Sequence, residues 1–256
     1  MFLRKTAANK RADLPAPPAL SAGSTALFTD LDGTLAPLEE KPGLVRPDAA
    51  RRRLLARLQN ALSGRLAVVS GRGLDDLDRI LEHDVIALSA AHGLVRRSAD
   101  GAVHGAARPA ALDDARDALQ AFVRADRGLL LEDKGPALAL HYRRSPGAAE
   151  ACEELVRRLA LANGLTVQQG DMVIELRAPG PDKGDAVTAF MAEPPFAGFT
   201  PVFIGDDLTD EHGFEAAARL GGFGVVVGNR RPTGALYALA DVAAALDWFS
   251  AASRAA

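Results

Sequence analysis

Cysteine, long apolar stretches and an excess of either charge are nearly absent from this sequence, and each shortage excludes a class of protein. One cysteine, Cys152, cannot form a disulfide within the chain, which favours a reducing compartment. The apolar stretch LGGFGVVVG (220–228) is far shorter than the ~20 residues of a membrane span. With 30 basic and 33 acidic residues the net charge is −3, so the positive field typical of nucleic-acid-binding proteins is missing. We therefore expect a cytoplasmic protein with no membrane and no nucleic acid among its partners.

Lysine is also scarce, because five lysines stand against 25 arginines. Where arginine is the usual cation, a retained lysine indicates a place that needs a compact, flexible point charge. Two of the five, Lys134 and Lys183, fall in segments with other polar signals. Cys152, in contrast, lies in a helical pattern and is expected to be a small buried side chain rather than a nucleophile.

What the sequence does contain is an alternation of short apolar runs with helical patterns. Its 256 residues, 48% of them hydrophobic, suffice for one or two domains with a substantial core. Asp48 is a predicted N-cap, and leucines 54, 55, 58 and 62 after it share one helix face. The alternation predicts a parallel sheet flanked by helices. The runs typical of its buried strands are 26–30, 65–70, 85–90, 200–206 and 223–228.

The pattern changes between about residues 109 and 180. Two helical segments there each precede a pair of strand-like runs joined by a short turn, which indicates antiparallel pairing. We expect a helix–hairpin–helix–hairpin unit inserted into the parallel-sheet domain. The N-terminal segment ends in PAPPALSAG, a composition typical of a flexible tail or linker. The predicted organisation is a flexible tail (1–23), a first part of the core (24–108), an α/β cap (109–179) and a second part of the core (180–256).

Polar side chains follow three of the predicted strands at the point where each strand ends. Asp30 ends the first run and Asp32 lies two residues beyond it, Ser70 ends the second, and Asp206 ends the run at 200–206. In an open parallel sheet, ligands bind outside the carboxyl ends of the strands, so these side chains should meet at one edge. Carboxylates this close would repel one another unless a cation neutralised them, and hard oxygen ligands favour Mg²⁺.

Such a cluster suits phosphoryl transfer. One aspartate of the Asp30/Asp32 pair could attack phosphorus to give an aspartyl phosphate, and the other could transfer protons. Ser70 and Lys183 could hold the non-reacting phosphate oxygens. Each piece alone has a plainer explanation: a turn, a helix cap, an acidic loop or a surface lysine. Four such pieces in this order, each at a predicted strand end or helix start, are hard to obtain by chance.

The same four segments, DLDGTL, VVSGR, DKG and GDDLTDE, resemble the motifs of the haloacid dehalogenase-like phosphatase superfamily. The segments LEDKGPALALHYRR and GDMVIELRAPGPDKGDAVTAFM narrow this to a resemblance to the trehalose-6-phosphate phosphatase family, over about residues 26–249. The resemblance implies a Rossmann-like core with an inserted α/β cap. It also implies Mg²⁺-dependent hydrolysis of trehalose 6-phosphate.

The resemblance further assigns roles to individual residues. It implies Asp30 as nucleophile and Asp32 as general acid and base, with Ser70 and Lys183 holding the phosphate. The implied Mg²⁺ ligands are the Asp30 carboxylate, the Asp32 carbonyl and Asp206, with Asp207 farther out. The implied substrate-binding residues are Glu132, Lys134, Glu175, Gly71 and Arg72.

Some matches to the family are loose. The family often has an acidic residue shortly after a His-Gly pair, whereas His92-Gly93 is followed here by leucine and valine. We therefore expect His92 to be a structural histidine with its hydrogen bonds satisfied, without a catalytic role. His141 and Arg143 match the family pattern and are left open as cap residues.

Two alternatives to this assignment stay open. A capped phosphatase for another sugar phosphate would share all four motifs and differ in the cap. A sugar-phosphate-binding module without turnover would not need Asp30, Asp32, Lys183 and Asp206 together. The expected partner is a small-molecule substrate; the sequence does not decide the oligomeric state and is compatible with a monomer.

Overall fold

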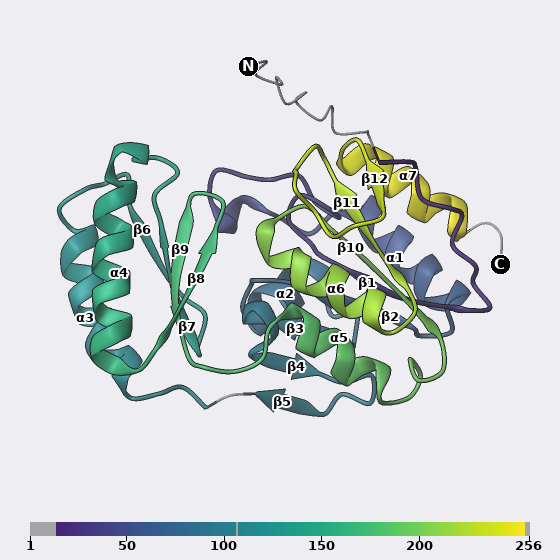
Figure 1. Ribbon diagram of the computed structural model, residues 1–256, viewed down its shortest axis with the longest axis horizontal. Helices are drawn as coiled ribbons and strands as arrows, with labels where there is room; N and C mark the ends of the chain where they lie inside the picture. The colour runs from purple at the N-terminus through teal and green to yellow at the C-terminus, as the bar shows by residue number, and fades with distance from the viewer. Residues whose placement is uncertain (1–13, 106, 254–256) are drawn as a thin grey trace, which may run out of the picture.

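The computed structural model describes residues 14–105 and 107–253, which form two sheets with helices packed against them (Figure 1). The larger sheet has eight strands in the order β12-β11-β10-β1-β2-β3-β4-β5, and the smaller has four in the order β6-β7-β9-β8. The strands of the larger sheet, in spatial order, are β12 (Tyr237–Leu239), β11 (Phe223–Val227), β10 (Thr200–Gly205), β1 (Thr25–Thr29), β2 (Leu66–Val69), β3 (Leu88–Ala90), β4 (Val95–Arg97) and β5 (Val103–Gly105).

The larger sheet is the predicted parallel core. All neighbouring pairs from β12 to β3 are parallel, and β4 and β5 continue the sheet as an antiparallel hairpin. Every residue of β1 is buried, because helices cover both faces. Leu27 points into the cluster that includes α1 (Ala49–Ala61), α2 (Leu74–Leu81) and α7 (Val242–Ala252). Its neighbour Phe28 points the other way, toward α5 (Lys183–Met191) and α6 (Glu211–Arg219).

The smaller sheet is built from the segment between the two halves of the core. Its strands are β6 (Leu130–Asp133), β7 (Ala137–His141), β8 (Thr166–Gly170) and β9 (Val173–Arg177), and all pairs are antiparallel. The helices α3 (Ala111–Val123) and α4 (Ala149–Asn163) cover one face through a separate apolar cluster that includes Leu140 and Ile174. Cys152 is buried in that cluster, as expected. The helix–hairpin–helix–hairpin order is therefore confirmed, and the proposed bounds at 109 and 179 stay a prediction.

Helix and turn signals explain several local features. The side chain of Asp48 accepts a hydrogen bond from the Arg51 amide at 2.7 Å, which confirms the predicted N-cap of α1. The described residues include four short 3₁₀ turns: η1 (Pro42–Leu44), η2 (Ala91–Gly93), η3 (Pro146–Ala148) and η4 (Leu208–Asp210). Within the described ranges, no helix is long and apolar enough to cross a membrane.

Two features differ from expectation. The predicted tail lies partly outside the described residues, but its proline-rich end packs on the core: the Ala238 amide donates to the Pro15 carbonyl at 3.0 Å, and the Trp248 indole donates to the Pro18 carbonyl at 2.9 Å. Leu20 is only 6% exposed. Polar and proline-rich composition favoured a flexible tail, but these two hydrogen bonds and one buried leucine tie residues 15–20 down. The β4–β5 hairpin was also missed, because its strands have only three residues each.

Candidate active site

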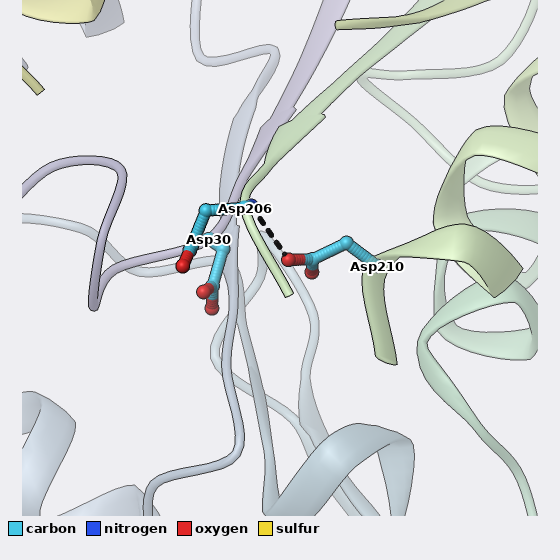
Figure 2. A group of neighbouring side chains, drawn as sticks. All are labelled: Asp30, Asp206 and Asp210. Carbon is cyan, nitrogen blue, oxygen red and sulfur yellow. Dashed lines mark hydrogen bonds between the residues drawn. The ribbon is translucent and has the colours of Figure 1, made fainter. Parts of the chain in front are cut away.

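The carboxyl ends of β1, β2 and β10 meet at one edge of the larger sheet, as predicted. Asp30 directly follows β1, and its amide donates to the Ile204 carbonyl of β10 at 2.9 Å. Figure 2 shows the resulting group of carboxylates, in which Asp30 and Asp206 extend side by side and Asp210 reaches toward them from η4. One oxygen from each of the three lies within 4.8 Å of the others. The edge of the sheet is therefore strongly acidic.

Asp210 has a different task from the other two carboxylates, because both of its oxygens are engaged. Its Oδ1 accepts a hydrogen bond from Lys183 Nζ at 2.6 Å, and its Oδ2 accepts from the amides of Asp206 and Asp207 at 2.9 Å each. The dashed line in Figure 2 marks the bond from the Asp206 amide. It is fully buried, and a side chain at Gly205 would overlap its carboxylate. The sequence analysis assigned it no role. The three-residue spacing from Asp207 at a helix start, typical of a capping box, was the available signal.

Lys183 is the cation of this cluster. It begins α5, is 2% exposed, and its Nζ lies 3.1 Å from Asp30 Oδ1 as well as 2.6 Å from Asp210. Burial alone would lower the pKa of Lys183, but the charges of Asp210 and Asp30 raise it well above its usual range, so the ammonium stays charged. One ammonium faces three carboxylates here, which leaves the group with an excess of negative charge.

Burial and the excess of negative charge raise the pKa values of the other two carboxylates, Asp30 and Asp206. Burial, followed by the charges of Asp210 and Asp32, raises the pKa of Asp30 to about 8 despite Lys183. Burial and the charge of Asp30 raise the pKa of Asp206 to about 9. Gly33 has a φ of +79°, and a side chain there would overlap the Asp206 carboxylate, so the turn is built to admit that group. The oxygen donors, their mutual repulsion and the glycine turn fit a hard divalent cation.

Asp32 points to a different partner. Arg72 grips both of its carboxylate oxygens, with Nε donating to Oδ2 at 2.6 Å and Nη2 donating to Oδ1 at 2.7 Å. The third nitrogen of Arg72, Nη1, donates to Asp76 and to the Pro42 carbonyl. Arg72 was predicted to bind substrate. It does line the cavity described next, but all three of its nitrogens already donate to protein oxygens, because the turn after β2 carries it over the turn after β1.

A cavity of about 730 Å³ lies between this edge and the smaller sheet. Every residue predicted for the site contributes to its wall, from both sheets. The predicted residues are Asp30, Asp32, Ser70, Gly71, Arg72, Glu132, Lys134, Glu175, Lys183, Asp206 and Asp207. Lining residues to which the sequence analysis assigned no role include Glu39, Glu40, Gln168, Gln169, Asn229 and Arg230.

The smaller sheet presents a row of polar side chains to the cavity. The register pairs Glu132 with Ala139, Ala139 with Glu175, and Glu175 with Gln168. These side chains share one face because residues opposite one another across a sheet point the same way, and the small alanine leaves room between the two glutamates. Their neighbours in sequence, such as Leu140 and Ile174, point toward α3 and α4. Alternation along the strands therefore separates the apolar face from the cavity face.

The charges in this row are paired. Lys134 donates to Glu175 Oε1, and His141 Nε2 lies 2.8 Å from Glu132 Oε2. Burial would raise the pKa of Glu175, but Lys134 and His92 hold it far below its usual range. Burial acts on Glu132 in the same direction and is outweighed by Lys134 and by the bond to His141, so its pKa is also lowered. Both glutamates are therefore ionised acceptors at neutral pH. The Oε2 atom of Glu175 has no protein partner within the described residues.

His92 differs from the expected satisfied histidine. Its ring is buried at the cavity wall with Nε2 3.4 Å from Glu175 Oε1, but its Nδ1 has no hydrogen-bond partner among the described residues. Arg143, left open from the sequence, donates from Nη2 to the Asp171 carboxylate at 2.7 Å beside the cavity.

Comparison with known proteins agrees with this geometry. A family model described as trehalose-phosphatase matches residues 28–243, most of the chain. The chain belongs to the trehalose-phosphatase family. A trehalose-6-phosphate phosphatase of Escherichia coli is 41% identical over 236 residues, covering 90% of this chain and 87% of the relative. A probable trehalose-phosphate phosphatase of Sinorhizobium fredii is 41% identical over 216 residues, covering 82% of each.

A solved structure shares the fold of this trehalose-phosphatase family member. The C-terminal domain of Candida albicans trehalose-6-phosphate phosphatase superposes with a TM-score of 0.81 at 22% identity, covering 96% of this chain and 99% of that one. The predicted fold class, a parallel α/β core with an inserted α/β cap, is therefore confirmed, as is the predicted family.

Proposed function

We propose that this protein hydrolyses trehalose 6-phosphate to trehalose and inorganic phosphate. The observation that carries the proposal is the single cavity that joins two chemically different walls. One wall has carboxylates, Ser70 and Lys183 at the edge of the larger sheet, and the other has the Glu132, Lys134 and Glu175 row of the smaller sheet. Membership of the trehalose-phosphatase family supports the same assignment.

In the first step, an Asp30 carboxylate oxygen attacks phosphorus and the bond from phosphorus to the sugar oxygen breaks. The products are an aspartyl phosphate and an alkoxide, which takes a proton from Asp32. In the second step, Asp32 removes a proton from water as that water attacks phosphorus. The bond from phosphorus to Asp30 breaks, phosphate leaves and both aspartates return to their starting state. For the first step Asp32 must loosen its contact with Arg72, which holds both of its oxygens.

Ser70 and Lys183 hold the phosphate oxygens that do not react. Lys183 is suited to this because its ammonium is buried, charged and fixed between Asp30 and Asp210. A fixed positive charge stabilises developing negative charge without reorganisation. Ser70 follows β2 and lines the cavity together with Gly71. Asp210 acts through Lys183 and is a positioning residue.

Mg²⁺ is the proposed metal, held by the carboxylates of Asp30 and Asp206 and by the Asp32 carbonyl, with Asp207 farther out. When bound, it supplies positive charge that keeps these carboxylates ionised and offsets the charge of the phosphate. Asp210 is not proposed as a ligand, although it lies in the same cluster, because both of its oxygens accept protein hydrogen bonds. The absence of histidine and cysteine from the carboxylate group favours Mg²⁺ over zinc.

The row on the smaller sheet is proposed to bind the sugar. A carboxylate can accept two hydrogen bonds from neighbouring hydroxyl groups, and Lys134 can donate to a third oxygen. Glu175 keeps one oxygen without a protein partner, and Glu132 keeps one oxygen that His141 does not approach. These groups lie on the wall opposite the phosphate site, so they suit the glucose ring farther from phosphorus. A cytoplasmic location is part of the proposal, on the ground of the single cysteine.

The test is to measure both products from trehalose 6-phosphate in the presence of Mg²⁺. We expect phosphate and trehalose in equal amounts from the wild-type protein and neither from Asp30→Asn, because an amide cannot form the acyl phosphate. Binding of trehalose 6-phosphate without turnover in the wild type would contradict the proposal and favour a binding module.

A further inference from the structure

His92 lies where the core meets the smaller sheet, in a turn that is held in an unfavourable backbone conformation. Ala91 and His92 have φ angles of 47° and 56°. Residues other than glycine and asparagine rarely adopt this left-handed region. The turn is fixed to the loop after β2, because the Ala91 amide donates to the Arg72 carbonyl at 2.8 Å and the His92 amide donates to the Ser70 carbonyl at 3.0 Å. Such strain occurs preferentially where a side chain must be held in one place.

The imidazole connects that core loop to the smaller sheet. Its ring lies over Gly71, where any side chain would overlap Cε1 and Nε2. Its Nε2 lies 3.4 Å from Oε1 of Glu175 on β9, and the two side chains are 13% and 2% exposed. His92 therefore contacts both the loop after β2 on the core and the row of polar side chains on the smaller sheet.

The surroundings of Glu175 indicate what this contact does. The Lys134 ammonium donates to its Oε1 and His92 Nε2 lies 3.4 Å from the same oxygen, while Oε2 has no protein partner among the described residues. Burial lowers the pKa of His92 and outweighs Glu175, so the imidazole is neutral and offers a hydrogen-bond donor rather than a charge. The hydrogen bond from Lys134 and the adjacent imidazole orient the carboxylate and leave Oε2 for a ligand.

We infer that His92 is a positioning residue for Glu175 and thereby sets the selectivity for the sugar. It holds the carboxylate in the orientation that accepts a sugar hydroxyl, and only when the smaller sheet lies against the core. The inference rests on the proposed function, since it takes Glu175 as a sugar-binding residue. Because the same turn is bonded to Ser70, it links the group that binds the sugar to the group that holds the phosphate. Loss of the link should therefore reduce kcat as well as raise KM.

The substitutions His92→Met and His92→Gln form a matched pair. The two side chains have nearly the same length and shape and meet the same backbone strain, but only glutamine has an N–H that can reach Glu175. We expect His92→Met to lower kcat/KM for trehalose 6-phosphate roughly 10-fold, and His92→Gln to recover most of the loss. The loss caused by His92→Met should be larger on trehalose 6-phosphate than on p-nitrophenyl phosphate, which has no sugar. Should His92→Met fail to fold, His92→Asn replaces it, because asparagine tolerates this backbone but is too short to reach Glu175.

A double-mutant cycle with Glu175→Gln separates positioning from general support of the fold. If His92 acts through Glu175, His92→Met should change kcat/KM little once Glu175 is already an amide. Three results would overturn the inference. They are additive losses of kcat/KM in the double mutant, equal losses of activity on trehalose 6-phosphate and p-nitrophenyl phosphate, and equal kcat/KM values for His92→Met and His92→Gln. If the wild type prefers another sugar phosphate, the proposed function fails separately, and the same cycle run with that substrate still decides the role of His92.

Discussion

Asp210→Asn tests the interpretation that this carboxylate organises the site without binding the metal. Asp210 uses one oxygen for the Lys183 ammonium and the other for two backbone amides. An asparagine has only one oxygen, so in either orientation its NH₂ group faces donors. Removing one partner of a buried ion pair costs about 3–5 kcal/mol, and the lower end applies because Lys183 keeps Asp30 at 3.1 Å. At ~2–4 °C per kcal/mol for a chain of this size, Tm should fall by roughly 6–12 °C.

Activity should fall with it. Depending on the orientation of the amide, either Lys183 loses its closest partner, or the amides of Asp206 and Asp207 lose the oxygen that accepts from both of them. Misplacement of reacting groups by about 1 Å can cost ~10²-fold in rate, so we expect kcat to drop by about that factor at saturating Mg²⁺. Thermal unfolding and phosphate release measure the two effects. The matched control is Asp117→Asn, on the exposed side of α3, which should change the free energy of unfolding by less than about 0.5 kcal/mol. If Asp210→Asn has the same Tm as the control variant and the same kcat as the wild type, this reasoning is wrong.

Three further predictions use the same site. Asp32→Asn should lower kcat by ~10²–10⁴-fold through lost proton transfer; retained turnover would place the acid elsewhere. Asp30 and Asp206 have raised pKa values when folded, so the metal-free protein binds more protons than the unfolded chain and should lose stability as pH rises from about 6 to 9. Since Mg²⁺ requires these carboxylates ionised, the rise in Tm on adding it should be larger at about pH 8.5 than at about pH 6, and an equal rise would contradict this. Alanine at Glu132, Lys134 or Glu175 should lower kcat/KM for trehalose 6-phosphate by at least ~10-fold and leave p-nitrophenyl phosphate hydrolysis unchanged; equal losses on both would assign these residues to the fold.

The parts of the fold that follow from local pattern were predictable. Asp30, Ser70 and Asp206 could be brought together from the sequence because parallel strands place their carboxyl ends at one edge, whatever their separation along the chain. The same holds for the alternation that puts Glu132 and Glu175 on the opposite face from Leu140 and Ile174.

Features that depend on which side chains meet across the fold were not predictable. Arg72 donates to Asp32 although the two residues are 40 positions apart in the sequence. A turn motif predicts where the backbone reverses, but not which way a long side chain such as that of Arg72 points. Asp210 was visible as one more acid in an acidic loop, and only the bond to Lys183 reveals its task. His92 was judged by its sequence neighbours, whereas its role follows from its contact with Glu175 on the other sheet. The packing of residues 15–20 depends on two carbonyl acceptors that composition does not reveal.

The central claim is that the smaller sheet selects a disaccharide phosphate while the larger sheet performs the chemistry. The most direct test is the ratio of kcat/KM for trehalose 6-phosphate to that for glucose 6-phosphate, which shares the phosphate and the first ring. Loss of two or more hydrogen bonds to charged groups, at ~1.5–3 kcal/mol each, predicts a preference of roughly 10²-fold or more for trehalose 6-phosphate. Equal values for the two substrates, or a higher value for glucose 6-phosphate, would contradict the account and favour a phosphatase for another sugar phosphate.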